Sequence, residues 1–66
     1  MSSTLKIGFL GAGKMATALA KGFIDARLVT RERVLASDPV TNARTHFTKV
    51  TAARATTENT AVLQFA

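Results

Sequence analysis

The sequence predicts an α/β fold, namely a partial Rossmann-type unit with a parallel sheet and a βαβαβ order of elements. A short apolar run at residues 6–10 meets a glycine-rich turn, and that turn opens a stretch with helical periodicity. A second apolar run at residues 34–36 ends at Pro39, which cannot donate to a central strand ladder. With 66 residues, the chain holds little more than one half of a dinucleotide-binding domain.

The glycine-rich turn follows the GxGxxA form of the dinucleotide fingerprint. Gly11 allows the tight turn, Gly13 lets the backbone approach a pyrophosphate, and Ala16 lets the helix pack on the strand. A strand precedes this motif, a helix follows it, and an acidic residue lies at about the expected distance, so the pattern predicts a phosphate-binding turn rather than a chance pair of glycines.

The first helix is predicted to begin at Lys14 and to close at residues 25–27. Met15, Leu19 and Phe23 form an apolar stripe with helical spacing, and we expect this stripe, with its neighbouring alanines, to lie on the sheet. The opposite face is expected to be solvated and carries Lys14, Thr17, Lys21 and Asp25. Gly22 weakens the helix interior, which suggests that close packing requires a glycine there.

The remaining elements are expected in order along the chain. A polar connection covers residues 28–33, a strand covers 34–36, and a helix at 41–49 is anchored by Phe47. A third strand at 54–56 follows, and Glu58 and Asn59 are expected to begin a third helix that continues through residue 66. A right-handed βαβ crossover then places the carboxyl ends of the strands at the same edge of the sheet as the glycine-rich turn.

Two residues near the end of the second strand bear on cofactor choice. Asp38 lies about 20 residues after the fingerprint, where a carboxylate can accept from the adenosine ribose. The alternative is that Asp38 caps a turn or a helix, and the two roles are compatible. Arg44 could meet a 2′-phosphate and favour NADP, whereas Asp38 would repel that phosphate and favour NAD. The choice between NAD and NADP stays open.

Composition excludes several classes of function. The formal charge of +5 is spread along the chain without interleaved aromatic residues, which argues against nucleic-acid binding. The chain has no cysteine, and its single histidine, His46, has no partner for a triad or metal site, so it is expected to be a solvated helix residue. No signal peptide or membrane-spanning run is visible, so we expect a soluble, cytoplasmic protein.

The segment IGFLGAGKMATALAKGFI resembles the amino terminus of pyrroline-5-carboxylate reductase, which typically opens with IGFIGAGxMAxALAxGF. The likeness continues through VLASDP at 34–39 and ATTENTAVLQFA at 55–66. It implies an NAD(P)H-dependent reductase that converts 1-pyrroline-5-carboxylate to L-proline in proline biosynthesis. Residues 1–66 would form the amino-terminal portion of the NAD(P)-binding Rossmann domain.

The resemblance also implies which residues bind the cofactor. The turn around the pyrophosphate and the two later contacts would be made by Leu10, Gly11, Ala12, Gly13, Lys14, Met15, Asp38 and Asn59. In relatives a small polar residue such as Ser or Asn often stands at the position of Asp38, so this difference bears on the preference for NADP. For Asn59 the alternative is a helix N-cap.

In the resembling family a carboxy-terminal helical domain forms the dimer and completes the substrate pocket. That domain has no counterpart in residues 1–66, no residue can be assigned to catalysis, and the chain alone is expected to be inactive. Two other functions are kept as alternatives. One is a stand-alone nucleotide-binding or basic interaction module, and the other is part of a coenzyme F420-dependent NADP reductase.

Overall fold

The computed structural model describes residues 5–66, which form a parallel three-stranded sheet between two layers of helices. The strands are β1 (Ile7–Leu10), β2 (Val34–Ser37) and β3 (Arg54–Thr56), in the spatial order β1-β2-β3. Both strand pairs are parallel, and β2 is central. This topology confirms the predicted fold class, and all three strands lie where the sequence predicts them.

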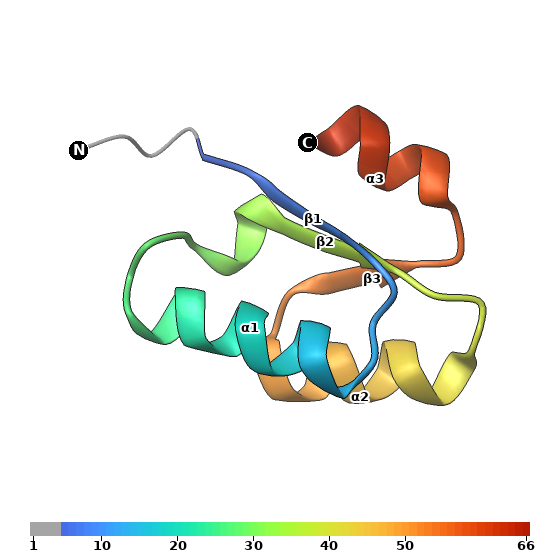
Figure 1. The fold of residues 1–66 in the computed structure, drawn as a ribbon, viewed down its shortest axis with the longest axis horizontal. Helices are drawn as coiled ribbons and strands as arrows, with labels where there is room; N and C mark the ends of the chain where they lie inside the picture. Colours follow the sequence, from blue (N-terminus) through green and yellow to red (C-terminus); the bar gives the residue numbers. More distant parts are fainter. Residues whose placement is uncertain (1–4) are drawn as a thin grey trace.

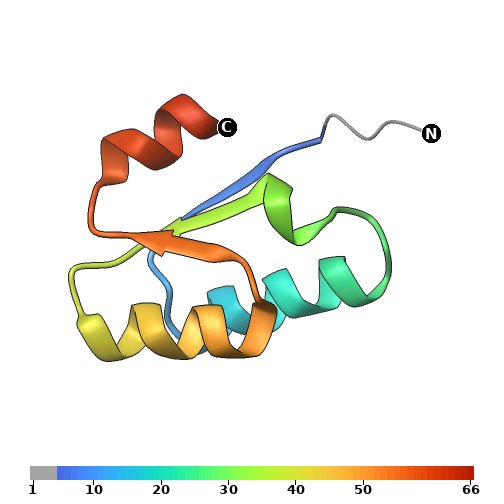
Figure 2. The ribbon, with the colours of Figure 1, turned by 180° about the vertical axis from the view of Figure 1, so that it is seen from behind.

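Helices alternate with these strands. They are α1 (Lys14–Asp25), α2 (Thr41–Thr51) and α3 (Asn59–Phe65), and a short 3₁₀ turn, η1 (Arg31–Arg33), precedes β2. Figure 1 shows α1 and α2 together on one face of the sheet and α3 on the other, and Figure 2 shows the same layers from behind. The second helix extends two residues past its predicted end.

The core lies between the sheet and the pair α1 and α2. All four residues of β2 are buried, as expected for a central strand covered on both faces. Phe47 is fully buried, which confirms its predicted role as the anchor of α2, and its ring meets Phe9 edge to face with 6.2 Å between centroids. Val29 is also buried in this core, although the sequence suggested a purely polar connection there.

The face of α1 that packs inward differs from the predicted one. Met15 is 79% exposed and Leu19 is 46% exposed, whereas Thr17 and Ala20 are buried. The prediction was therefore wrong for Met15 and Leu19, and for Thr17, which was expected on the solvated face, but it is confirmed for Ala20 and for Phe23, which packs against the core. It failed because it weighted large apolar side chains, while the fully buried residues of this helix are small. Within the described residues the hydroxyl of Thr17 has no hydrogen-bond partner.

The explanation offered for Gly22 was also wrong. A Cβ built at this position meets no heavy atom within 4 Å, so close packing does not require the glycine. The close approach occurs instead at Gly8 in β1, where an added Cβ would lie 2.6 Å from Cγ1 of Val62. Val62 is buried in α3, so Gly8 is the residue that lets α3 rest on the sheet.

The described residues include no helix that is long and apolar enough to cross a membrane. The sequence-based expectation that no signal peptide is present concerns in part residues 1–4, which lie outside the described residues.

Gly8→Ala is expected to lower the free energy of unfolding by about 1–3 kcal/mol, the usual cost of an overpacked contact. The stiff, β-branched side chain of Val62 can move away from the new methyl group only if α3 shifts. Thermal and urea unfolding monitored by circular dichroism would measure the change. The double variant Gly8→Ala with Val62→Ala should lose less than the sum of the two single changes.

Gly22→Ala is the matched control, because it adds the same methyl group where no atom stands in the way. This variant should be more stable than the wild type by roughly 1 kcal/mol, since alanine is the better helix former. A loss of stability at Gly22 as large as that at Gly8 would contradict this account of both glycines.

Candidate functional site

The loops that follow the three strands meet at one edge of the sheet. Leu10, Ser37 and Thr56 lie at the same level, because Leu10 pairs with Ser37 and Ser37 pairs with Thr56. Two further backbone bonds continue this alignment: the amide of Gly11 donates to the carbonyl of Ser37 at 2.6 Å, and the amide of Asp38 donates to the carbonyl of Thr56 at 2.9 Å. The glycine-rich turn and the loops after β2 and β3 are therefore joined directly.

The glycine-rich turn leaves the beginning of α1 open. Gly11 has a φ of +115°, a backbone conformation that residues with a side chain rarely adopt, so this position requires glycine. Gly13 precedes α1, and a Cβ built on it meets no atom within 4 Å. Among residues 5–66 no side chain caps the helix, so within this part of the chain the first-turn amides lack both helical and capping partners. This space and these donors fit a pyrophosphate.

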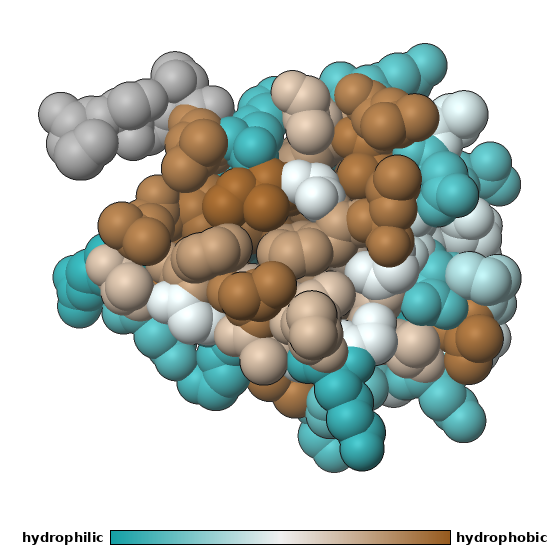
Figure 3. All heavy atoms as spheres, in the orientation of Figure 1, coloured by the Kyte–Doolittle hydropathy of each residue, from teal (hydrophilic) through white to brown (hydrophobic). Residues whose placement is uncertain are grey.

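A hollow of about 430 Å³ lies beside this turn and the outer edge of β1. Its lining residues are Phe9, Leu10, Gly11, Gly13, Lys14, Met15, Ala16 and Leu19. The apolar side chains that the sequence placed under the sheet, Met15 and Leu19, are therefore part of this open surface. Figure 3 shows hydrophobic side chains gathered across this side of the molecule.

Asp38 binds the glycine-rich turn through its side chain. Its Oδ2 accepts from the amide of Ala12 at 3.0 Å, and its Oδ1 accepts from the amide of Val40 at 2.9 Å. The bond from Ala12, then the bond from Val40, lower the pKa of Asp38 against a smaller opposing effect of burial, and the charge of Arg44 lowers it further. Asp38 is thus held as a carboxylate at the carboxyl end of β2.

Arg44 folds back onto the loop that contains Asp38. Its Nη1 donates to the carbonyl of Asp38 at 2.7 Å, and its Nη2 donates to Oγ1 of Thr41 at 3.1 Å. The guanidinium therefore stabilises the connection between β2 and α2. It lies beside the carboxylate of Asp38, whose expected effect on the preference between NAD and NADP is opposite to its own.

Asn59 is joined to the end of β2. The hydroxyl of Ser37 donates to Oδ1 of Asn59. Asn59 is the first residue of α3 and Glu58 occupies the N-cap position, so the alternative that Asn59 is the N-cap is wrong. Ser37 is fully buried and connects two predicted site residues, but the sequence analysis did not single it out. Its position directly before Asp38 at the strand end was the available signal.

The structure brings the sequence-predicted site residues to a single edge. Leu10 to Met15 form the turn, Asp38 is bonded to that turn, and Asn59 is bonded to the residue before Asp38. His46, in contrast, lies exposed on α2. The sequence placed these groups correctly at strand ends, and the contacts among them come from the structure.

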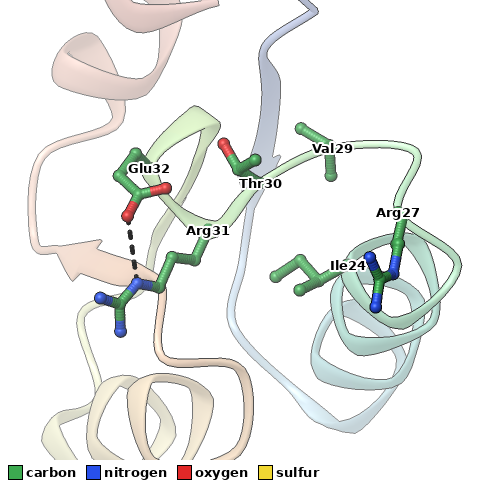
Figure 4. A pocket seen from close by; sticks show the side chains of 6 residues that line it. All are labelled: Ile24, Arg27, Val29, Thr30, Arg31 and Glu32. Carbon is green, nitrogen blue, oxygen red and sulfur yellow. Dashed lines mark hydrogen bonds and ion pairs between the residues drawn. The ribbon is translucent and has the colours of Figure 1, made fainter. Parts of the chain in front are cut away.

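A second hollow, of about 370 Å³, lies at the other end of the sheet. It is lined by Ile24, Arg27, Val29, Thr30, Arg31 and Glu32, and Figure 4 shows them around it. Arg31 and Glu32 are paired at 3.1 Å. Because these residues precede β2, this hollow is remote from the carboxyl edge and does not belong to the candidate site.

Comparison with known proteins identifies the family. The profile described as NADP oxidoreductase, coenzyme F420-dependent, matches residues 6–66. The chain belongs to this family of oxidoreductases. The matched residues include the open glycine-rich turn and the loops after β2 and β3. No solved structure gives a significant match to the chain.

Several curated relatives of the chain are named pyrroline-5-carboxylate reductase. Pyrroline-5-carboxylate reductase 3 of Mus musculus is 44% identical over 64 residues, and that of Macaca fascicularis is 41% identical over 63 residues. These alignments cover 97% and 96% of the chain and 23% of each relative. The reductase of Methanosarcina acetivorans is 61% identical over 33 residues, which are 50% of the chain and 12% of the relative. The resemblance expected from the sequence is confirmed, and the chain spans about a quarter of the mammalian relatives.

The lowered pKa of Asp38 predicts an acid-dependent loss of stability. A carboxyl group whose pKa is lower in the folded state stabilises the fold above its unfolded pKa of about 4, and this contribution is lost as the pH falls through the folded value. The wild type should therefore lose more stability than Asp38→Asn between about pH 5 and pH 2. Thermal melts of both proteins across this range test the prediction.

Glu32 also has a lowered pKa, caused first by its own backbone amide and then by Arg31, so acid destabilises both proteins to some degree. The difference between wild type and Asp38→Asn isolates the part that belongs to Asp38. A difference that stays constant from neutral to acid pH would contradict the assigned contacts.

Proposed function

We propose that the chain is the cofactor-binding portion of an NAD(P)H-dependent reductase that converts 1-pyrroline-5-carboxylate to L-proline. The observation that carries this proposal is the open, uncapped start of α1 behind Gly11 and Gly13, joined at one sheet edge to Asp38 and Asn59. The similarity to reductases of that name over 97% of the chain supports the choice of substrate. The reduced nicotinamide would supply the hydride.

In this proposal the cofactor is held mainly by backbone. The free amides at the beginning of α1 and the positive end of the helix dipole would bind the pyrophosphate, with Gly11 and Gly13 shaping the turn and Lys14 adding a positive charge. Asn59 would contact the cofactor from the beginning of α3. The remaining lone pairs of the Asp38 carboxylate would accept from the adenosine ribose.

We further propose that the preferred cofactor is NADH. The carboxylate of Asp38 is fixed by two amides and stays ionised at neutral pH, so a 2′-phosphate placed beside it would be repelled. Arg44 does not offset this repulsion fully, because two of its nitrogens already bind the loop. We therefore give the effect of Asp38, which favours NAD, more weight than the effect of Arg44, which favours NADP.

A second candidate is a coenzyme F420-dependent NADP reductase, which the description of the matching family supports. Preference for the phosphorylated cofactor would favour this alternative. In either case we propose a cytoplasmic protein with a small-molecule substrate and no nucleic-acid partner. The complete reductase would be a homo-oligomer, because the relatives' remaining three quarters would contain the substrate and dimer domain.

Fluorescence titration of the chain with NADH and with NADPH tests the cofactor proposal. NADH should bind more tightly by about tenfold, which corresponds to roughly 1.4 kcal/mol of repulsion between the carboxylate and the 2′-phosphate. Asp38→Ser should reverse the preference, and Arg44→Ala should increase it. If neither substitution changes the ratio of the two affinities, the roles given to these residues are wrong.

The same preparation should form no L-proline when it is supplied with 1-pyrroline-5-carboxylate and NADH. Proline formation by the isolated chain would contradict the expectation that the described residues bind the cofactor without completing a catalytic site. Absence of binding to either dinucleotide would contradict the proposed function itself.

A further inference from the structure

We propose that Asp38 is a positioning residue, which holds the glycine-rich turn in its binding shape before any cofactor arrives. This inference rests on the proposed function, because it assigns the turn to pyrophosphate binding. It differs from a contact with the ribose, since the group that Asp38 acts on is the backbone amide of Ala12.

All the polar groups of Asp38 have partners in the structure. Its two carboxylate oxygens accept from the amides of Ala12 and Val40. Its own amide donates to the carbonyl of Thr56, and its carbonyl accepts from Arg44. Two bonds therefore hold the side chain, one to the glycine-rich turn and one within its own loop, and two more hold the backbone of Asp38 to β3 and to α2. Together they make the carboxylate a rigid support for the turn.

Ala12 is the point of the turn that needs this support. The residue is 1% exposed and belongs to the core cluster, and the partner of its amide is the part-exposed carboxylate of Asp38, whose removal would break that bond and open the amide to water. It lies between Gly11 and Gly13, the two residues with the greatest backbone freedom in the turn. A bond at Ala12 therefore restricts both glycines at once, and less conformational entropy is lost when a ligand binds.

The positioning role of Asp38 can be distinguished by experiment from the electrostatic effect of its charge on an anion. A carboxylate near the pyrophosphate repels it, so removal of the charge would by itself tighten the binding of an anion. If Asp38 positions the turn, removal of the side chain should instead weaken binding. The two effects have opposite signs, and inorganic pyrophosphate, which has no ribose, reports on the turn alone.

The experiment compares the wild type with Asp38→Ala, Asp38→Asn and the control Asp25→Ala. Asp25 is an exposed acid at the end of α1 that pairs with Lys21, so its removal changes the net charge equally without touching the turn. Amide hydrogen exchange at Ala12 is measured by nuclear magnetic resonance in the free proteins. Pyrophosphate affinity is then obtained from the shifts of the Gly13 and Lys14 amides.

Asp38→Ala should accelerate exchange at Ala12 by at least about tenfold and weaken pyrophosphate binding about fivefold. The control Asp25→Ala should leave the exchange at Ala12 unchanged and should bind pyrophosphate no more weakly than the wild type. Asp38→Asn, which keeps one acceptor, should fall between the two and provides the comparison if Asp38→Ala does not fold. Unchanged exchange at Ala12, or tighter pyrophosphate binding by both Asp38 variants, would overturn the inference.

The two readouts separate this inference from the proposed function. Exchange at Ala12 depends on the bond to Asp38 and needs no ligand. If exchange responds as expected while the wild type binds neither pyrophosphate nor NADH, the proposed function fails and the glycine-rich turn has no phosphate to position. If NADH binds and exchange does not respond, only the positioning role is wrong.

Discussion

The register of the parallel sheet is the constraint on which the site depends. Because Leu10, Ser37 and Thr56 lie at one level, the loops after three strands begin beside one another, and backbone bonds from Gly11 and Asp38 extend the alignment past the strand ends. A shift of one residue in β2 would turn Ser37 and Asp38 to the opposite faces of the sheet. The glycine-rich turn would then lose both its backbone and its side-chain support.

Most of the secondary structure could be predicted from the sequence, because each element has a local signal. Pro39 ends the second strand, Gly11 and Gly13 mark the turn, and Phe47 gives its helix an apolar anchor. The packed face of α1 could not be predicted in this way. Hydrophobic periodicity ranks Met15 and Leu19 above Ala20, but helices that approach closely bury small residues.

The contacts within the site could be predicted only in part. The spacing of Asp38 from the fingerprint placed it correctly at the turn, and the resemblance placed Asn59 near it. That Asp38 would bind Ala12, or that Arg44 would bind the carbonyl of Asp38, depends on side-chain directions that sequence spacing does not contain. The sequence analysis treated Gly8 only as part of a strand, because the contact that requires a glycine there is made with Val62 of α3, far along the chain.

The outer position of β1 has a consequence for solubility. In the described residues β1 pairs only with β2, so its other edge presents unpaired backbone groups, next to the exposed side chains of Leu10 and Met15. Such an edge can template the addition of strands from other chains and so promote aggregation. Lys6 directly precedes this strand and Lys14 begins the helix after the glycine-rich turn, and their like charges oppose the approach of a second copy.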